Sequence, residues 1–211
     1  MTASIATLPR AEATRPNLTP RVAAYGFAGA WIAGLAVNPA GPAIDAPDAE
    51  VAAHYAGNAA GALTAEVLTH GVAAACLALV VAGIVRHARR TGSPHALYAR
   101  AAYAGVAVSV VQLLTGTSAV IASEASTVAD RFDLLNRLDG AKLLLFAVAA
   151  VASIRIIGGW LGRVSVVLAV TIAIAGVAFL VGSPTLALAA APALVLLIVW
   201  VVASGRRAAG A

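Results

Sequence analysis

The chain has 211 residues, of which 61% are hydrophobic and only 11% are charged, and its formal net charge is +5. Soluble domains carry about 25% charged residues, so this composition excludes an ordinary soluble globular protein. The long apolar stretches lack the alternating pattern of membrane β-strands, so they indicate an all-α, polytopic membrane protein.

Six apolar stretches are predicted transmembrane helices, each close to the roughly 20 residues that cross a bilayer. They cover residues 22–38, 62–85, 101–122, 140–158, 164–182 and 186–203. With their connections they form a predicted six-helix bundle over residues 21–205. The polar residues 1–20 are expected to be a disordered cytoplasmic tail, and residues 206–211 a second cytoplasmic tail.

The charged residues are divided between the two ends of this predicted bundle. Of the 14 Lys and Arg residues, 11 lie in the N-terminal tail, in residues 86–100 and 155–163, or at the C-terminus, whereas 8 of the 9 acids lie toward the other side. The positive-inside rule then predicts a plasma-membrane protein with both termini in the cytoplasm. No basic helix with interleaved aromatic residues accompanies the charge, so we expect no nucleic-acid partner.

Two connections on the outer side are predicted to contain short amphipathic helices. Asp48 is suited to cap a helix over residues 49–56, and Val51 and Tyr55 would place that helix at the membrane interface. A second short helix is predicted with Ser126 or Thr127 as its cap. Its apolar stripe consists of Phe132, Leu135 and Leu138.

The second predicted span contains an ionisable pair, Glu66 and His70. The two residues are four positions apart, so they share one face of a helix. Such a pair is costly in hydrocarbon and usually faces protein or a water-filled cavity, which makes Glu66 and His70 candidate catalytic residues. Gln112 of the third predicted span lies at a similar depth, and we expect it to approach His70.

Further candidate ligand-binding residues lie near the outer end of the bundle. Asp139 and Lys142 are three positions apart, and Lys142 would extend outward or pair with Asp139 or Glu66. The other candidates are Asn136, Arg137 and, on the first predicted span, Trp31. Together these residues are expected to line a polar pocket that opens to the outer leaflet between the first four spans.

The last two predicted spans form a hairpin over residues 164–203 that contains no charged residue. We expect this hairpin to be a scaffold, or the surface through which a homo-oligomer forms. No cofactor or metal is expected. A bis-histidine haem needs two histidines inside the membrane, and only His70 lies in a predicted span.

Three functional interpretations follow. The first is a pocket for a small amphiphilic or lipid-like ligand, extending to an acid/base enzyme of isomerase or cyclase type that uses Glu66 and His70. The second is a proton-coupled carrier or channel. The third is a structural or partner-binding protein in which the same two residues only join helices through hydrogen bonds. The chain contains no Walker loop, dinucleotide fingerprint or nucleophile elbow.

Three segments carry a resemblance to known proteins: PDAEVAAHYAGN, NRLDGAKLLL and WLGRVSVVLAV. In these segments and in layout the chain resembles a broad group of small actinobacterial integral membrane proteins with about six helices. The resemblance implies a multi-pass plasma-membrane protein, and it assigns no activity to any residue.

Overall fold

The computed structural model describes residues 18–39, 41–122 and 124–210, and all regular elements in this part of the chain are helices. Most of the predicted N-terminal tail lies outside the described residues, although its last two positions already belong to the first helix. The helices are α1 (Thr19–Val37), α2 (Asp48–Gly57), α3 (Ala59–Glu66), the π-helix η1 (Val67–Val72), α4 (Ala73–Arg90), α5 (Ala96–Ile121), α6 (Ala125–Ile157), α7 (Gly159–Val181), α8 (Pro184–Ala187) and α9 (Ala190–Ala209).

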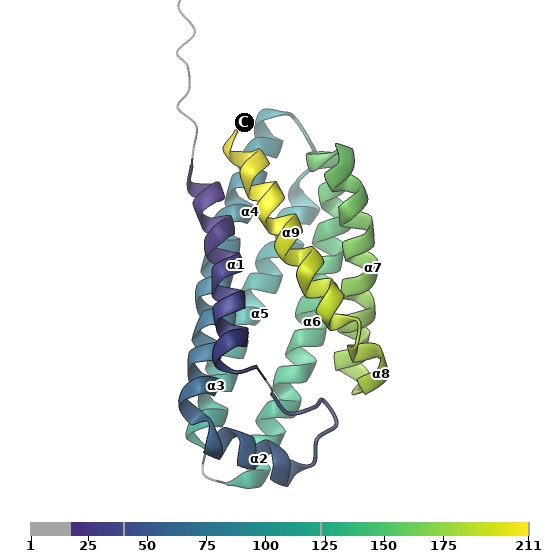
Figure 1. Cartoon of the computed structure of the whole chain (residues 1–211). Coiled ribbons are helices and arrows are strands. Elements are labelled where there is room, and N and C mark those ends of the chain that lie inside the picture. The colour runs from purple at the N-terminus through teal and green to yellow at the C-terminus, as the bar shows by residue number, and fades with distance from the viewer. Residues whose placement is uncertain (1–17, 40, 123, 211) are drawn as a thin grey trace, which may run out of the picture.

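The long helices run up and down in one bundle, with α2 and α8 at the end opposite to the C-terminus (Figure 1). Five helical stretches of the described chain are long and apolar enough to cross a membrane. They are Ala59–Arg90, Ala96–Ile121, Ala125–Ile157, Gly159–Val181 and Pro184–Ala209. The all-α membrane architecture is thereby confirmed. The shorter α1 has Arg21 in its first turn and is not one of the five.

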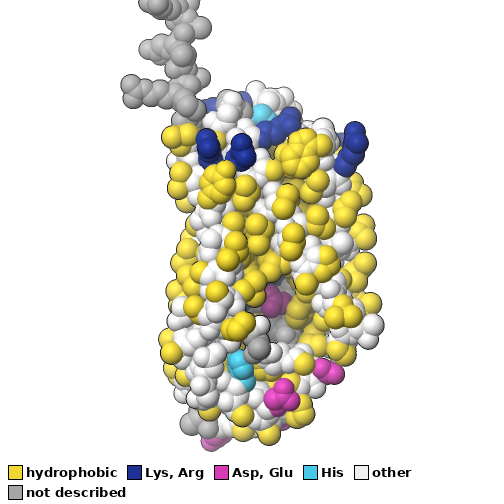
Figure 2. Space-filling model, in the orientation of Figure 1, with side chains coloured by type: hydrophobic (Ala, Val, Ile, Leu, Met, Phe, Trp, Pro, Cys, Tyr) yellow, Lys and Arg dark blue, Asp and Glu magenta, His cyan; other side chains and the backbone are white. Residues whose placement is uncertain are grey.

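The side chains on the surface follow the division expected for such a bundle. Figure 2 shows hydrophobic side chains along the length of the visible face, Lys and Arg side chains at one end, and acidic side chains toward the other. We call these the basic end and the acidic end. Large apolar residues such as Leu114, Ile121 and Val181 are more than half exposed, as expected for side chains that face lipid rather than water.

The structure differs from the sequence-based boundaries in several places, one of which is the last predicted span, residues 186–203, where α8 ends at Ala187 and α9 begins at Ala190. Residues 126–138 are not a separate short helix, because α6 runs without interruption over 33 residues. No glycine or proline occurs before Gly140, so nothing in this segment ends the helix. The predicted C-terminal tail also begins as helix, since α9 continues to Ala209.

Small residues bring the helices close together at the basic end. Gly205 of α9 packs against the backbone of Pro20 and the side chain of Ala24 in α1, where a Cβ would lie 2.7 Å from the Pro20 carbonyl oxygen. Figure 1 shows α9 crossing the bundle obliquely from α1 at this end toward α7 and α8 at the other. The helices α1 and α9 therefore separate toward the acidic end (Figure 1), and a cavity lies between them there.

Candidate functional site

The helix that carries Glu66 and His70 is not a regular α-helix at this point. Glu66 is the last residue of α3, and His70 lies within the π-helix η1. The Thr69 hydroxyl donates a hydrogen bond to the Ala65 carbonyl oxygen at 2.7 Å, within the same distorted region. Short π segments are rare and are frequently found at functional sites, because the extra residue shifts the side chains that follow it.

Lys142 of α6 is the centre of a buried polar cluster. Its side chain is only 4% exposed, and its Nζ lies 2.6 Å from Asp139 Oδ1 and 2.7 Å from Gln112 Oε1. A third, longer contact of 3.5 Å reaches His70 Nδ1. The three ammonium protons therefore all have acceptors, which is the condition for keeping a charged lysine inside hydrocarbon.

His70 connects Lys142 to Glu66. An ammonium group can only donate hydrogen bonds, so Nδ1 of His70 is the acceptor and its ring proton lies on Nε2. That Nε2 faces Glu66 Oε2 at 3.7 Å, which is longer than a hydrogen bond. In the described part of the chain, Glu66 Oε2 is buried without a hydrogen-bond partner.

The remaining candidate residues differ in how close they lie to this cluster. The Trp31 ring meets the His70 ring edge-on, with centroids 6.5 Å apart and an interplanar angle of 77°. Asn136 has a buried Nδ2 with no partner among the described residues. Arg137 points away, since its side chain is 69% exposed and lies 3.9 Å from Asp133, an exposed pair of little energetic value.

Tyr55 of α2 is a neighbour of this cluster that the sequence pattern does not indicate. It is buried, and burial together with the negative charge of Glu66 raises the pKa of Tyr55 to about 12. The sequence places Tyr55 only at the membrane interface. Its proximity to Glu66 depends on how α2 folds back under the bundle, for which a single sequence contains no signal.

A cavity of about 220 Å³ lies on the other side of Lys142. Its polar lining residues are Thr69, Ser109, Asp139 and Lys142. Its apolar lining residues include Phe27, Trp31, Leu143, Phe146, Phe179 and Leu194. The cavity lining does not include Glu66, His70 or Gln112. Since His70 and Gln112 contact Lys142, which does line the cavity, they lie behind Lys142 as seen from the cavity.

The cavity is mainly apolar, and the uncharged hairpin contributes much of its wall. Phe179 of α7 and Ala193 of α9 line it together with residues of the earlier helices. The cavity therefore differs from the expected polar pocket between the first four spans, because the hairpin also lines it and most of its lining is apolar. Figure 2 shows an acidic side chain at the bottom of a hollow between hydrophobic side chains on the lateral face.

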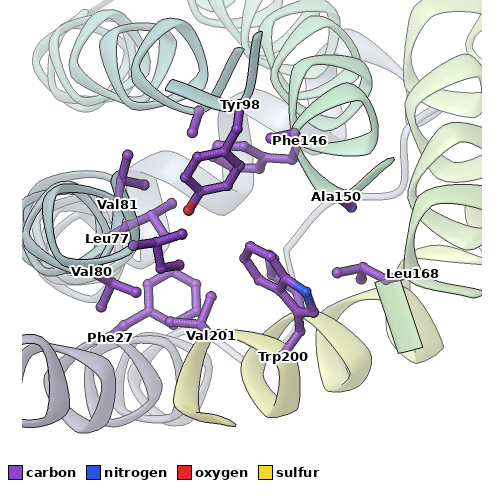
Figure 3. Packing of buried hydrophobic residues seen from close by; sticks show 14 of the residues in the cluster. Phe27, Leu77, Val80, Val81, Tyr98, Phe146, Ala150, Leu168, Trp200 and Val201 are labelled. Atoms are coloured by element: carbon purple, nitrogen blue, oxygen red, sulfur yellow. The ribbon is translucent and has the colours of Figure 1, made fainter. Parts of the chain in front are cut away.

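A second, smaller cavity of about 20 Å³ lies beyond Phe146. Leu77, Phe146 and Leu197 line both cavities and so form the partition between them. Tyr98 lines the smaller one, and its buried hydroxyl lacks a hydrogen-bond partner among the described residues. Figure 3 shows this hydroxyl pointing into the space between Leu77 and Trp200, where the surrounding side chains are apolar.

Within the described residues, no group of three or more His, Cys, Asp or Glu side chains could hold a metal ion. The polar cluster consists instead of one lysine, one histidine, two carboxyl groups and one amide. Such a set can hold and transfer protons and can orient a polar head group. No family model, curated protein or solved structure matches the chain.

Proposed function

We propose that the protein binds a small amphiphilic or lipid-like molecule in the cavity between α1 and α9. The observation that supports this most directly is an apolar cavity of about 220 Å³ whose wall includes the ion pair of the buried Lys142 with the partly exposed Asp139. Apolar cavities of about 150 Å³ accept a benzene-sized molecule. This cavity therefore suits one ring or a short chain segment with its polar head at the ion pair, while the rest of the ligand extends into lipid.

The proposal includes a topology of six spans, with both termini in the cytoplasm of a plasma-membrane protein. In Figure 1, α1 runs alongside the long helices over much of their length, as a sixth span would. The Arg residues of the turns and termini gather at the basic end, which the positive-inside rule assigns to the cytoplasm. They are Arg21, Arg86, Arg89, Arg90, Arg100, Arg155, Arg163, Arg206 and Arg207. The cavity then opens toward the outer leaflet.

Native mass spectrometry of the purified protein tests whether the cavity holds a ligand. Ala193 lines the cavity and is 2% exposed, so Ala193→Phe should fill the cavity and displace a bound lipid. Val195 on the same helix is 62% exposed, so Val195→Phe is a matched control. We expect the wild type and the control to retain a defined adduct that Ala193→Phe loses. Identical adducts on all three proteins would contradict a ligand in this cavity.

Acid/base catalysis on the bound amphiphile is a second candidate function. Its support is a series of proton-holding groups from the cavity wall through Lys142 and His70 to Glu66, whose Oε2 lies 3.7 Å from His70 Nε2. In this role Lys142 and Asp139 face the ligand, His70 passes a proton between its two ring nitrogens, and Glu66 stores it. Gln112 fixes the position of Lys142.

The substitution Glu66→Gln tests this second function. It keeps the shape of the side chain and removes its exchangeable carboxyl proton, so turnover should fall by roughly 10²–10⁴-fold while ligand binding persists. The assay is conversion of the co-purified lipid by wild type and variant. A wild type that binds lipid but forms no product would leave binding as the function. A carrier role has less support, because the core toward the basic end, around Leu77, Val81 and Phe146, is apolar.

A further inference from the structure

We infer that the ligand of this cavity has a head group that donates a hydrogen bond, a hydroxyl or an amine. The Asp139 carboxylate accepts that hydrogen bond. This inference rests on the proposed binding function and specifies the chemical class of the ligand. It follows from counting which donors and acceptors of the polar lining residues are already used within the protein.

The donors of Lys142 are already used. Its three protons face Asp139 Oδ1, Gln112 Oε1 and His70 Nδ1. An anionic head group would have to replace one of these contacts, because an ammonium group has no fourth proton. Within the described lining Lys142 is the one cation, and Trp31 adds only a neutral indole N–H.

The acceptors of the cavity, in contrast, remain available. The Asp139 side chain is 30% exposed, and a carboxylate offers about four acceptor positions, of which Lys142 Nζ engages one on Oδ1 at 2.6 Å. Thr69 and Ser109 donate their hydroxyl protons to the carbonyl oxygens of Ala65 and Gly105, at 2.7 Å and 3.3 Å. Their free lone pairs add acceptors, so the polar part of the wall suits a donor head group.

A carboxylate or phosphate head group needs hydrogen-bond donors, but it would meet the acceptor oxygens of Asp139 instead. It would approach the negative charge of Asp139 in a medium of low dielectric constant, where like charges repel far more strongly than in water. A hydroxyl or ammonium head would instead make a charge-assisted hydrogen bond to the carboxylate. The wall therefore selects between classes of lipid that have identical tails.

The test compares decanol, decylamine and decanoic acid, whose tails match, for binding to the purified protein in a non-ionic detergent. Native mass spectrometry counts the molecules bound to the wild type and to Ala193→Phe. Molecules held by the micelle or the protein surface bind to both proteins, so the difference between the two counts gives the molecules in the cavity. We expect decanol or decylamine to bind at least about tenfold more tightly than decanoic acid, as one hydrogen bond to a charged group allows. A preference for the amine over the alcohol would assign a cationic ligand.

The outcomes separate this inference from the binding function. If decanoic acid binds as tightly as the other two, the donor-head inference is wrong while the binding function stands. If none of the three shows a difference between wild type and Ala193→Phe, the binding function itself fails. The variant Asp139→Asn should reduce the preference for decanol or decylamine over decanoic acid about tenfold or more. Should it fold poorly, the double variant Asp139→Asn/Lys142→Met keeps the cavity neutral and must show the same reduction.

Discussion

The carboxyl group of Glu66 lies directly against the backbone of Gly116 in α5, so a Cβ at position 116 would overlap that carboxyl group. Glu66 is therefore confined between the π segment and the neighbouring helix, with His70 Nε2 at 3.7 Å from its Oε2. The absence of a side chain at Gly116 is what allows a carboxyl group to be buried here.

Replacing Gly116 by alanine should displace Glu66. We expect Gly116→Ala to cost about 1–3 kcal/mol of stability, because the added methyl group overpacks a well-filled contact. The measurement is thermal unfolding in detergent. Gly29→Ala is the control, since its Cβ would meet nothing within 4 Å, and it should be neutral or stabilise the helix by up to about 1 kcal/mol. Equal melting temperatures for the two variants would show that Glu66 is not confined by α5.

The ion pair of the buried Lys142 with Asp139 should show strong energetic coupling. Lys142→Met and Asp139→Asn each leave one charge without its partner, at a cost of about 3–5 kcal/mol, and the double variant should recover part of that loss. Unfolding of the four proteins of this cycle gives the coupling energy. The exposed pair Arg137–Asp133 is the control, with a coupling of at most about 1 kcal/mol. Simple additivity at Lys142 and Asp139 would contradict the geometry.

Phe146 should limit how much of the ligand tail lies inside the cavity. Its side chain separates the cavity of about 220 Å³ from the one of about 20 Å³, so Phe146→Ala should join them and shift the preference toward longer alcohols. The assay ranks decanol, dodecanol and tetradecanol by competition. Phe179→Ala enlarges the larger cavity without opening this partition, so its length preference should stay that of the wild type. An unchanged ranking in Phe146→Ala would place the tail elsewhere.

Tyr55 should make the protein less stable at high pH. Its pKa is raised from 10.0 to about 12 in the folded protein, so above pH 10.0 the hydroxyl ionises first in the unfolded chain. The stability that this shift represents is present below pH 10.0 and is lost as the pH rises to about 12, by an amount on the order of 2–3 kcal/mol. The variant Tyr55→Phe should lack this loss of stability between pH 10.0 and about 12, and thermal unfolding over this pH range measures it. Tyr25→Phe, at a residue 46% exposed, should behave as the wild type.

Cysteine labelling tests the orientation in the membrane. In a Cys76→Ala background, cysteines at Asp48 and Asp130 should react with an impermeant reagent on intact cells, and one at Thr91 should react only after lysis. Thr91 is preferable to its neighbour Gly92, whose φ of 66° would strain a side chain. Labelling of Thr91 on intact cells would reverse the orientation and place the cavity opening in the inner leaflet.

The helical architecture and two residue pairs of the polar cluster could be predicted because they leave local signals in the sequence, whereas the contacts of Lys142 with Gln112 and His70 join different helices. Long apolar stretches predict helices, and the i, i+4 spacing of Glu66 and His70 predicts their proximity, observed at 3.7 Å. The i, i+3 spacing of Asp139 and Lys142 likewise places them within reach, and they lie 2.6 Å apart. These are relations within one helix, where the geometry is fixed by the backbone.

The cavity could not be predicted because it depends on packing between distant helices. The residues that α7 and α9 contribute, such as Phe179 and Ala193, are apolar and resemble any lipid-facing side chain in sequence. The π segment around His70 leaves no periodic signal either, since one extra residue in a turn does not change the composition. The oblique path of α9 is set by contacts such as Gly205 with α1, which a hydropathy pattern does not contain.

The divergence of α1 and α9 has a consequence for how occupancy should be controlled. A site that opens sideways between two helices exchanges its ligand with the surrounding bilayer, so the relevant concentration is a mole fraction in the membrane. Each additional methylene in the free ligand enriches it in lipid by about 0.8 kcal/mol, without any contact to Phe27 or Ala193. Dilution of the aqueous phase should therefore leave a long-chain ligand bound, whereas dilution with extra lipid should release it.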